Sequence, residues 1–150
     1  MPDLRTLLGM KLVLCHGTFD FPHYGHLKHF EEARTHGDYL VVTITADAFV
    51  NRGPGRPVTK EYERKAVISA WRCVDYAEIL YEKTGLSAIR TFRPAVYCKG
   101  GDYKDEDRHG SLEAEKKEVE KYGGKLIITS RLPGYSSTIL IERIKKCGMT

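Results

Sequence analysis

The stretch KLVLCHGTFDFPHYGHLKHF, residues 11–30, carries the strongest structural signal in this chain. Its first part, 11–15, is an apolar run typical of a buried strand. A turn-prone, aromatic-flanked segment follows, and apolar residues then recur at helical spacing as far as Ala33. The stretch therefore predicts a strand, a short loop and a helix. His23 and His26, three residues apart, would then lie on one face of the first helical turn.

The predicted helix start is suited to binding phosphate. The first turn of a helix has backbone N–H groups without intrahelical partners, and the helix dipole places positive charge there. The imidazoles of His23 and His26 add further donors, so the sequence indicates a site for a phosphoryl group. Two other interpretations remain open. The pair could bind zinc, although a third ligand at a suitable spacing is missing and Cys15 is expected inside the sheet, or both histidines could be surface residues without a role.

Length and composition favour one globular domain. The 150 residues are 41% hydrophobic and 29% charged, which allows a single core and leaves too few residues for two ordinary domains. We therefore assign residues 1–150 to one domain, with an N-terminal extension at 1–10 and a mobile polar loop at 104–110.

The sequence also bears on location and partners. No apolar run is long enough to span a bilayer, and the N-terminus lacks the apolar region of a signal peptide, so no membrane partner is expected. The cysteines form no CxxC pair and are expected to be buried thiols in a reducing cytoplasm: Cys15, Cys73, Cys98 and Cys147. The net charge of +4 is modest and forms no basic tail, which suits an anionic small molecule and predicts no nucleic-acid partner.

Strands and helices alternate along the rest of the sequence. Further strands are predicted at 39–45, 74–80, 95–98 and 125–129, and helices at 59–72, 87–92, 113–122 and from Ser136 or Ser137 onward. This alternation predicts an α/β fold with three layers (α/β/α), in which helices cover both faces of a mostly parallel, five-stranded sheet.

Two of these helices have a specific expected buried face. Thr59 is predicted to cap the helix at 59–72, and its apolar side is formed by Tyr62, Ala66, Ala70 and Trp71. The buried face of the last helix is expected to consist of Leu140, Ile144 and Cys147.

Four unusual segments each follow a predicted strand: 16–26, 52–56, 99–103 and 131–138. In open parallel sheets, ligands bind beyond the carboxyl ends of the strands, where the strand order reverses. We therefore expect these segments to meet on one rim of the sheet and to form a binding site there.

Four motifs, in chain order, give this sequence a resemblance to a known superfamily. GTFDFPHYGH (17–26) resembles the HxGH signature of the nucleotidyltransferases that include cytidylyltransferases and are distantly related to class I aminoacyl-tRNA synthetases. GRPVTKEYERKAV (55–67) resembles their segment that ends in an arginine-bearing helix, with Arg64 in the arginine's place. CKGGDYK (98–104) is similar to a segment of the bacterial enzymes that make ADP-heptose from heptose 1-phosphate. RLPGYSST (131–138) is similar to the closing RTEGISTT signature, which is seen in glycerol-3-phosphate cytidylyltransferases and, in altered form, in the ADP-heptose enzymes.

The resemblance implies a Rossmann-like fold and a nucleotidyltransferase activity. The enzyme would transfer a nucleoside monophosphate from a triphosphate, with ATP favoured, to a sugar phosphate such as heptose 1-phosphate, releasing pyrophosphate. Mg²⁺ is expected to be bound with the triphosphate, without a dedicated protein metal site. Relatives of this kind are commonly dimers, so a homodimer is expected.

The same resemblance implies roles for individual residues. Those implied in catalysis at the α-phosphate are His23, His26, Lys28 and Arg131. Those implied in binding the nucleotide are Gly17, Thr18, Phe19, Asp20, Gly25, Arg64, Lys99, Gly100, Gly101, Asp102, Tyr103, Ser136, Ser137 and Thr138. Arg52 and Arg56 are expected to reach the phosphate of the acceptor. Asp20 is expected to order its loop rather than to touch the metal.

Several alternatives remain open. The segment 131–138 looks like the cytidylyltransferase version and 98–104 like the heptose version, so the alternative activity uses CTP and glycerol 3-phosphate or another phosphorylated polyol. Ser137 stands where the closing signature usually has threonine, which preserves a hydroxyl group. Arg64 could be a solvent-facing arginine and Asp102 an ordinary turn residue. A non-catalytic nucleotide- or RNA-binding module is the alternative of another class, but both histidines are present and no basic stripe with interleaved aromatics is found.

Overall fold

A parallel five-stranded sheet forms the centre of the protein. Its strands are β1 (Leu12–Gly17), β2 (Tyr39–Thr45), β3 (Tyr76–Leu80), β4 (Val96–Lys99) and β5 (Lys125–Ile128), in the order β3-β2-β1-β4-β5. All pairings of these strands are parallel, so the predicted sheet is confirmed and contains no antiparallel strand among the described residues. The strand order reverses beside β1, which lies between β2 and β4 and thus at the position where such sheets bind ligands.

The structure is a computed structural model and describes residues 8–101 and 111–148. The mobile loop predicted at 104–110 and the candidate residues Asp102 and Tyr103 lie outside these ranges, as does most of the extension predicted at 1–10.

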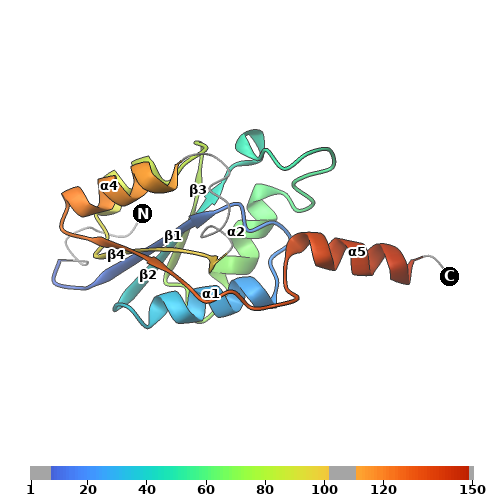
Figure 1. Ribbon diagram of the computed structural model, residues 1–150, viewed down its shortest axis with the longest axis horizontal. Coiled ribbons are helices and arrows are strands. Elements are labelled where there is room, and N and C mark those ends of the chain that lie inside the picture. The colour runs from blue at the N-terminus through green and yellow to red at the C-terminus, as the bar shows by residue number, and fades with distance from the viewer. Residues whose placement is uncertain (1–7, 102–110, 149–150) are drawn as a thin grey trace.

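Helices cover both faces of the sheet, which confirms the predicted three-layer α/β/α, Rossmann-like architecture (Figure 1). Their bounds are α1 (Tyr24–Arg34), α2 (Glu61–Ser69), α3 (Leu86–Phe92), α4 (Leu112–Lys121) and α5 (Ser137–Cys147), with a short 3₁₀ helix η1 (Asp47–Phe49) after β2. Helices α1 and α2 pack on one face around Phe30 and Ile68, while α3 and α4 pack on the other around Ile89 and Val119.

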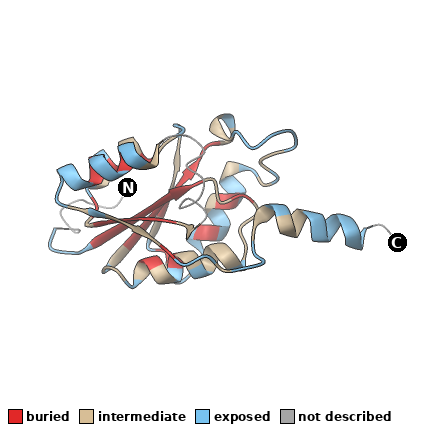
Figure 2. Ribbon diagram, viewed as in Figure 1, coloured by how far each residue is buried: buried red, intermediate tan, exposed pale blue. Residues whose placement is uncertain are grey.

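The sheet is the core of the protein. Every residue of β1 is buried, and so are all residues of β2 after Tyr39 (Figure 2). Because both faces of the sheet are buried, these strands are nearly continuous apolar runs in the sequence. Cys15 and Cys98 are buried as expected, but Cys147 is exposed and Cys73 is only partly buried, which corrects the prediction for those two thiols.

The side of helix α2 that packs against the sheet is not the side predicted from the sequence. Lys60, not Thr59, is its N-cap residue, and its buried residues are Arg64 and Ile68. Tyr62 is 65% exposed, because it lies two residues from Arg64 and therefore points to the opposite side of the helix. Trp71, beyond the end of the helix, packs against the core as expected.

The expectation for the last helix was also wrong. No residue of α5 is buried, and Ile144 is 55% exposed. The helix leaves the site and extends past the rest of the molecule, so its apolar side has no sheet beneath it (Figures 1 and 2). No helix within the described ranges is long and apolar enough to cross a membrane.

Candidate active site

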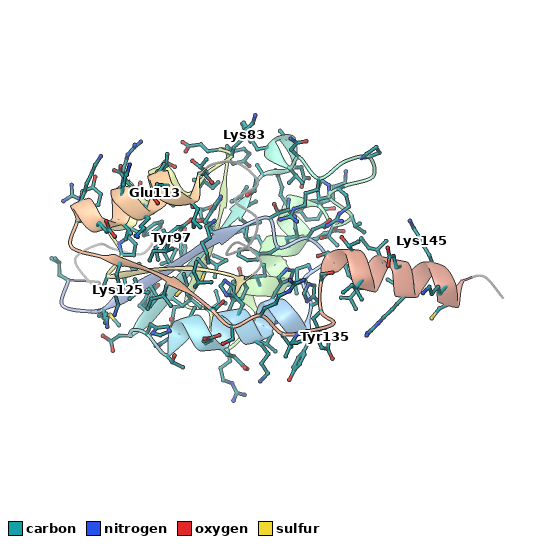
Figure 3. The ribbon with its side chains drawn as sticks, viewed as in Figure 1. Lys83, Tyr97, Glu113, Lys125, Tyr135 and Lys145 are labelled. Carbon is teal, nitrogen blue, oxygen red and sulfur yellow. The ribbon has the colours of Figure 1, made fainter. Side chains whose placement is uncertain are left out.

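A cavity of about 440 Å³ opens beyond the carboxyl end of β1. The N-termini of α1 and α5 both lie at this cavity, and Figure 3 shows Tyr135 just before α5. The Tyr135 ring packs edge-on against Tyr24 of α1, with ring centroids 5.2 Å apart. The structure brings these predicted site residues to its wall: Gly17, Thr18, Phe19, Asp20, His23, Gly25, His26, Arg52, Arg56, Gly100, Gly101, Arg131, Ser136, Ser137 and Thr138. Segments that follow four different strands thus meet on one rim, as expected from the sheet topology.

Backbone hydrogen bonds around the two histidines determine which ring nitrogen carries the proton. His23 is the N-cap residue of α1, and its Nδ1 atom accepts a hydrogen bond from the N–H of Gly25 at 3.0 Å. The Nδ1 atom of His26 accepts one from the N–H of His23 at 3.3 Å. Because a neutral imidazole has one acceptor and one donor nitrogen, each ring carries its proton on Nε2. Both side chains therefore present an N–H donor while uncharged.

The surroundings of the histidines favour this neutral form. Burial lowers the pKa of His23, and burial together with the charges of His23, His29 and Arg52 holds the pKa of His26 well below its ordinary value. The two rings are stacked with centroids 3.7 Å apart, so a proton on one disfavours a proton on the other. Near neutral pH the pair donates hydrogen bonds without carrying charge of its own.

Asp20 holds the loop that precedes α2 against the cavity. Its carboxylate accepts hydrogen bonds from the N–H groups of Val58 and Thr59 at 2.9 and 3.0 Å, and from the hydroxyl of Thr59 at 3.0 Å. It also forms an ion pair with Nε of Arg56 at 2.7 Å. These contacts use the carboxylate to tie the loop after β1 to the loop before α2, and they direct Arg56 toward Asp20.

Arg64 is neither exposed nor at the cavity wall. It is fully buried, and its guanidinium donates to the carbonyl oxygens of Thr18 at 2.7 Å and Thr45 at 2.8 Å. It also donates to the carbonyl of Thr59 and forms an ion pair with Asp47 at 2.5 Å. Its burial contradicts the alternative of a solvent-facing arginine. Because Arg64 does not line the cavity, the structure also gives no support to direct contact with the nucleotide. Arg64 instead fixes the backbone that surrounds the cavity.

Three other predicted residues differ from expectation. Lys28 does not line the cavity, because its ammonium group is exposed and pairs with Glu31 at 2.9 Å. Lys99 is buried and donates to the carbonyl of His16 at 3.1 Å, so it lines a neighbouring recess rather than the main cavity. Ser137 lines the cavity, but its hydroxyl donates to the carbonyl of Asp20 at 2.5 Å and ties α5 to the loop after β1.

The loop after β1 holds an unusual backbone conformation. Phe19 and Phe21 both have a φ of 50°, in the left-handed region that non-glycine residues rarely adopt. The Phe19 ring lies so close to Gly17 that a Cβ atom there would come within 2.9 Å of it. The ring also forms a T-shaped pair with His26, with centroids 5.5 Å apart. Backbone strain of this kind gathers at functional sites, where the surrounding contacts hold it.

Sequence reasoning missed several residues of the site. His16 at the end of β1 and His29 on α1 both line the cavity. The side chain of His29 contacts Thr129 at 2.6 Å, and Thr129 donates to the carbonyl of Lys99 at 3.2 Å. His16 belongs to the quoted segment and ends a strand, which was a usable signal. His29 lies one turn beyond His26, but nothing in the sequence shows that its ring reaches Thr129, just after β5.

The described residues provide no ready-made metal site. No three side chains of the histidine, cysteine, aspartate or glutamate type lie close enough there to hold a metal ion. In addition, the Nδ1 atoms of His23 and His26 already accept backbone hydrogen bonds.

Comparisons with known proteins agree with the fold. Residues 14–143 match the family described as "Cytidylyltransferase-like". The bifunctional protein HldE of Geotalea uraniireducens is 42% identical over 139 residues, which are 91% of this chain and 27% of that protein. HldE of Geobacter metallireducens is 41% identical over 138 residues, again 91% and 27% of the two chains. The chain thus spans about a quarter of the length of these relatives.

Solved structures show the same architecture. The lipopolysaccharide core biosynthesis protein of Thermoplasma volcanium GSS1 superposes with a TM-score of 0.64 at 30% identity, covering 83% of this chain and 98% of that one. Pantoate-beta-alanine ligase of Francisella tularensis has a TM-score of 0.57 at 16% identity, covers 92% and 70%, and shares the fold alone. The family match spans all five strands from Leu14 onward and every segment of the cavity wall. The chain therefore belongs to the cytidylyltransferase-like family of nucleotidyltransferases.

Proposed function

We propose that this protein transfers the adenylyl group of ATP to a sugar 1-phosphate of the heptose type, forming an ADP-sugar and releasing pyrophosphate. One observation carries the proposal: two helix N-termini and the paired Nε2–H donors of His23 and His26 line the same cavity. Such a cavity supplies N–H donors from two sides to a chain of phosphates.

The proposed reaction needs alignment more than it needs a base. A phosphate oxygen of the sugar phosphate attacks the α-phosphorus, the new P–O bond forms, and the bond from the α-phosphorus to the bridging oxygen of pyrophosphate breaks. The attacking oxygen is already anionic, so no proton has to be removed. The catalytic requirement is to hold the reactants in line and to stabilise the negative charge that develops on the α-phosphoryl oxygens.

The chain's own residues meet this requirement. His23 and His26 would donate to oxygens of the triphosphate without having to change protonation, because their Nε2–H groups are fixed by the backbone. The N-terminus of α5 would contact the phosphates from the other side through the backbone at Ser136, Ser137 and Thr138. Arg52 and Arg131 reach the wall of the cavity and would add positive charge. Lys28 would contribute only through a different side-chain rotamer.

Mg²⁺ remains part of the proposal. The Asp20 carboxylate is occupied by Arg56, Val58 and Thr59, so a magnesium ion would be held by oxygens of the triphosphate and by water. When bound, it would neutralise charge on the phosphates.

The heptose-type acceptor rests on two similarities. The segment CKGGDYK resembles that of enzymes forming ADP-heptose, and one similar structure is that of a lipopolysaccharide core biosynthesis protein. The alternative, CTP with glycerol 3-phosphate, is favoured by the closing segment RLPGYSST. A cytoplasmic location is proposed because the reaction consumes a nucleoside triphosphate. A homodimer also remains a proposal, which the molar mass measured by light scattering would test.

The experiment measures pyrophosphate release with ATP and with CTP, each combined with heptose 1-phosphate, hexose 1-phosphates and glycerol 3-phosphate. We expect ATP with heptose 1-phosphate to give the highest kcat/KM. Preference for CTP and glycerol 3-phosphate would establish the alternative. Binding of a triphosphate without turnover of any acceptor would favour the non-catalytic module.

A further inference from the structure

A second, smaller recess adjoins the main cavity and contains a buried carboxylate that the proposed chemistry does not use. The recess shares His16, Gly17, Thr18 and Arg52 with the cavity wall, so the two spaces meet. Its volume is about 20 Å³, which is room for about one water-sized group. Glu115, from the first half of α4, lines it.

One oxygen of Glu115 has a fixed structural role. The side chain is 1% exposed, and Oε1 accepts a hydrogen bond from the N–H of Gly85 at 2.8 Å. This bond joins α4 to the beginning of α3. It also orients the carboxylate so that its other oxygen is held in one place.

The other oxygen has no hydrogen-bond donor within residues 8–101 and 111–148. Oε2 of Glu115 is buried and accepts no hydrogen bond from the described residues. The Nζ atom of Lys99 lies 3.6 Å away, close enough for an ion pair but beyond hydrogen-bond distance. A buried carboxylate oxygen without a donor is costly, and an O–H group that enters the recess beside this ion pair can donate to Oε2.

The position of the recess relates it to the acceptor. It lies toward the ends of β2 and β3, where Thr45, Asn51 and Lys83 also line it, and Figure 3 shows Lys83 beyond the end of β3. The two helix N-termini proposed to bind the triphosphate belong to the main cavity instead. Arg52 lines both spaces and would contact the acceptor's phosphate where they meet.

We propose that Glu115 is a specificity-determining residue that accepts a hydrogen bond from one hydroxyl group of a polyhydroxylated sugar-phosphate acceptor, whose hydroxyl enters the recess beside Lys99. This inference rests on the proposed function and names the group of the acceptor that is recognised. A site built around such a bond rejects an acceptor that lacks the hydroxyl, because the carboxylate is then left without its donor.

The test compares wild type and Glu115→Gln with ATP and two kinds of acceptor: heptose 1-phosphate and its monodeoxy derivatives. For wild type, kcat/KM is expected to fall about 10- to 100-fold for one particular monodeoxy derivative, the loss typical of a hydrogen bond to a charged group. Glu115→Gln is expected to lose a similar factor with the full acceptor and little more with that derivative. The discrimination between the two acceptors therefore approaches one.

A purely structural role for Glu115 predicts a different result. The variant would then lose activity equally with both acceptors, the discrimination would stay at its wild-type value, and the proposal would be overturned. Glu118→Gln is the matched control, since Glu118 is a second buried glutamate of α4 but pairs with Arg90 and Lys121 away from the recess. It is expected to retain wild-type discrimination.

Two further measurements separate this inference from the proposed function. Calorimetric binding of heptose 1-phosphate and its monodeoxy derivatives to wild type needs neither turnover nor a folded variant, and equal affinities across the series would overturn the role of Glu115. A lack of turnover with selective binding would contradict the proposed function alone. The second measurement is the ratio of kcat/KM for ATP to that for 2′-deoxy-ATP or 3′-deoxy-ATP. If Glu115→Gln changes this ratio and not the one between acceptors, the recess binds a hydroxyl of the nucleotide and the assignment to the acceptor is wrong.

Discussion

The imidazole ring of His26 is stacked on that of His23, with centroids 3.7 Å apart and planes inclined by 27°. Each ring accepts a backbone N–H through Nδ1, so the N-terminus of α1 uses its own free donors to set the tautomer of the side chains beside it. The donors proposed to contact phosphate are therefore fixed before substrate binds. Preorganisation of this kind matters for a reaction whose main requirement is alignment.

Removal of the His26 donor is expected to reduce turnover strongly. His26→Ala should lower kcat by about two to three orders of magnitude, the cost typical of losing one donor that acts in the transition state. His26→Gln is the matched variant, because its amide N–H can replace Nε2–H. We expect it to retain more activity than the alanine variant. Steady-state kinetics with a circular dichroism check of folding measure both, and a nearly active His26→Ala would contradict the role.

Loss of the Asp20 charge is expected to loosen the loop before α2. The hydrogen bonds from Thr59, Val58 and Arg56 outweigh the effect of burial and lower the pKa of Asp20, so the ionised form is the one that the fold holds. Asp20→Asn should reduce the free energy of unfolding by about 2–4 kcal/mol, because it leaves Arg56 without its partner. Urea unfolding at pH 7.5 measures this loss. A change below about 0.5 kcal/mol would show that these contacts contribute little.

Arg64 is expected to be more important for stability than an exposed helix arginine. Nη1 of Arg64 donates to the carbonyls of Thr18 and Thr45 while Nε and Nη2 bond to Thr59 and Asp47. Lysine has one nitrogen and cannot make all of these bonds at once, so Arg64→Lys should cost about 3–5 kcal/mol. The neighbouring Lys65→Met is the control, because Lys65 is partly exposed and its ion pair with Glu78 spans 3.5 Å. It should change stability by less than about 1 kcal/mol. Similar losses for both variants, measured by denaturant unfolding, would contradict the role of Arg64.

The sheet could be predicted well from the sequence, because strands that are buried on both faces consist of continuous apolar runs. The β-branched, apolar run of β2 and the position of each site loop after a strand were sufficient to place the rim. The surface against which a helix packs was harder to predict from the sequence. The spacing of Leu140 and Ile144 predicts an apolar side for α5 but cannot show that the helix extends past the sheet.

The same limit applies to the site. The motif located Arg64 in the chain, yet nothing local shows that a charged side chain points into the protein, because its partners are carbonyls of distant segments. Glu115 could not be found either. It lies in a charged helical stretch that reads as solvent-exposed, and its burial depends on contacts with Gly85 and Lys99.

Stability is expected to decrease in mild acid. Burial lowers the pKa of His16 to about 3, with Lys99 contributing, and that of His29 to about 4. Both values lie below the ordinary value of 6.5, so the unfolded chain binds more protons than the folded one below that pH. The stabilisation is present above about pH 6.5 and is lost as the pH falls toward 4 and then 3.

Urea unfolding at pH 7.5, 6 and 5 measures this dependence. The variant His16→Asn replaces one titrating ring and should flatten the slope of unfolding free energy against pH. Its stability at pH 7.5 will be lower, since contacts with Thr43 and Thr45 change, but the slope is a separate readout. An unchanged slope would show that His16 does not stay neutral in the folded protein.

Gly25 offers a way to disturb the histidine pair without weakening the helix. A Cβ atom at this position would lie 2.8 Å from Cε1 of His23 and 3.0 Å from Cβ of Tyr135, so Gly25→Ala must displace the ring or separate the two helix N-termini. Alanine favours a helix over glycine by about 1 kcal/mol, which offsets part of the steric cost. We expect kcat/KM to fall about 10- to 100-fold, as small misplacements of catalytic groups do, while the free energy of unfolding changes little. Gly148→Ala is the matched control, because its nearest neighbour would be 3.6 Å away, and it should leave the kinetics unchanged. Wild-type kinetics for Gly25→Ala would mean that the stacked arrangement of His23 and His26 is not required for turnover.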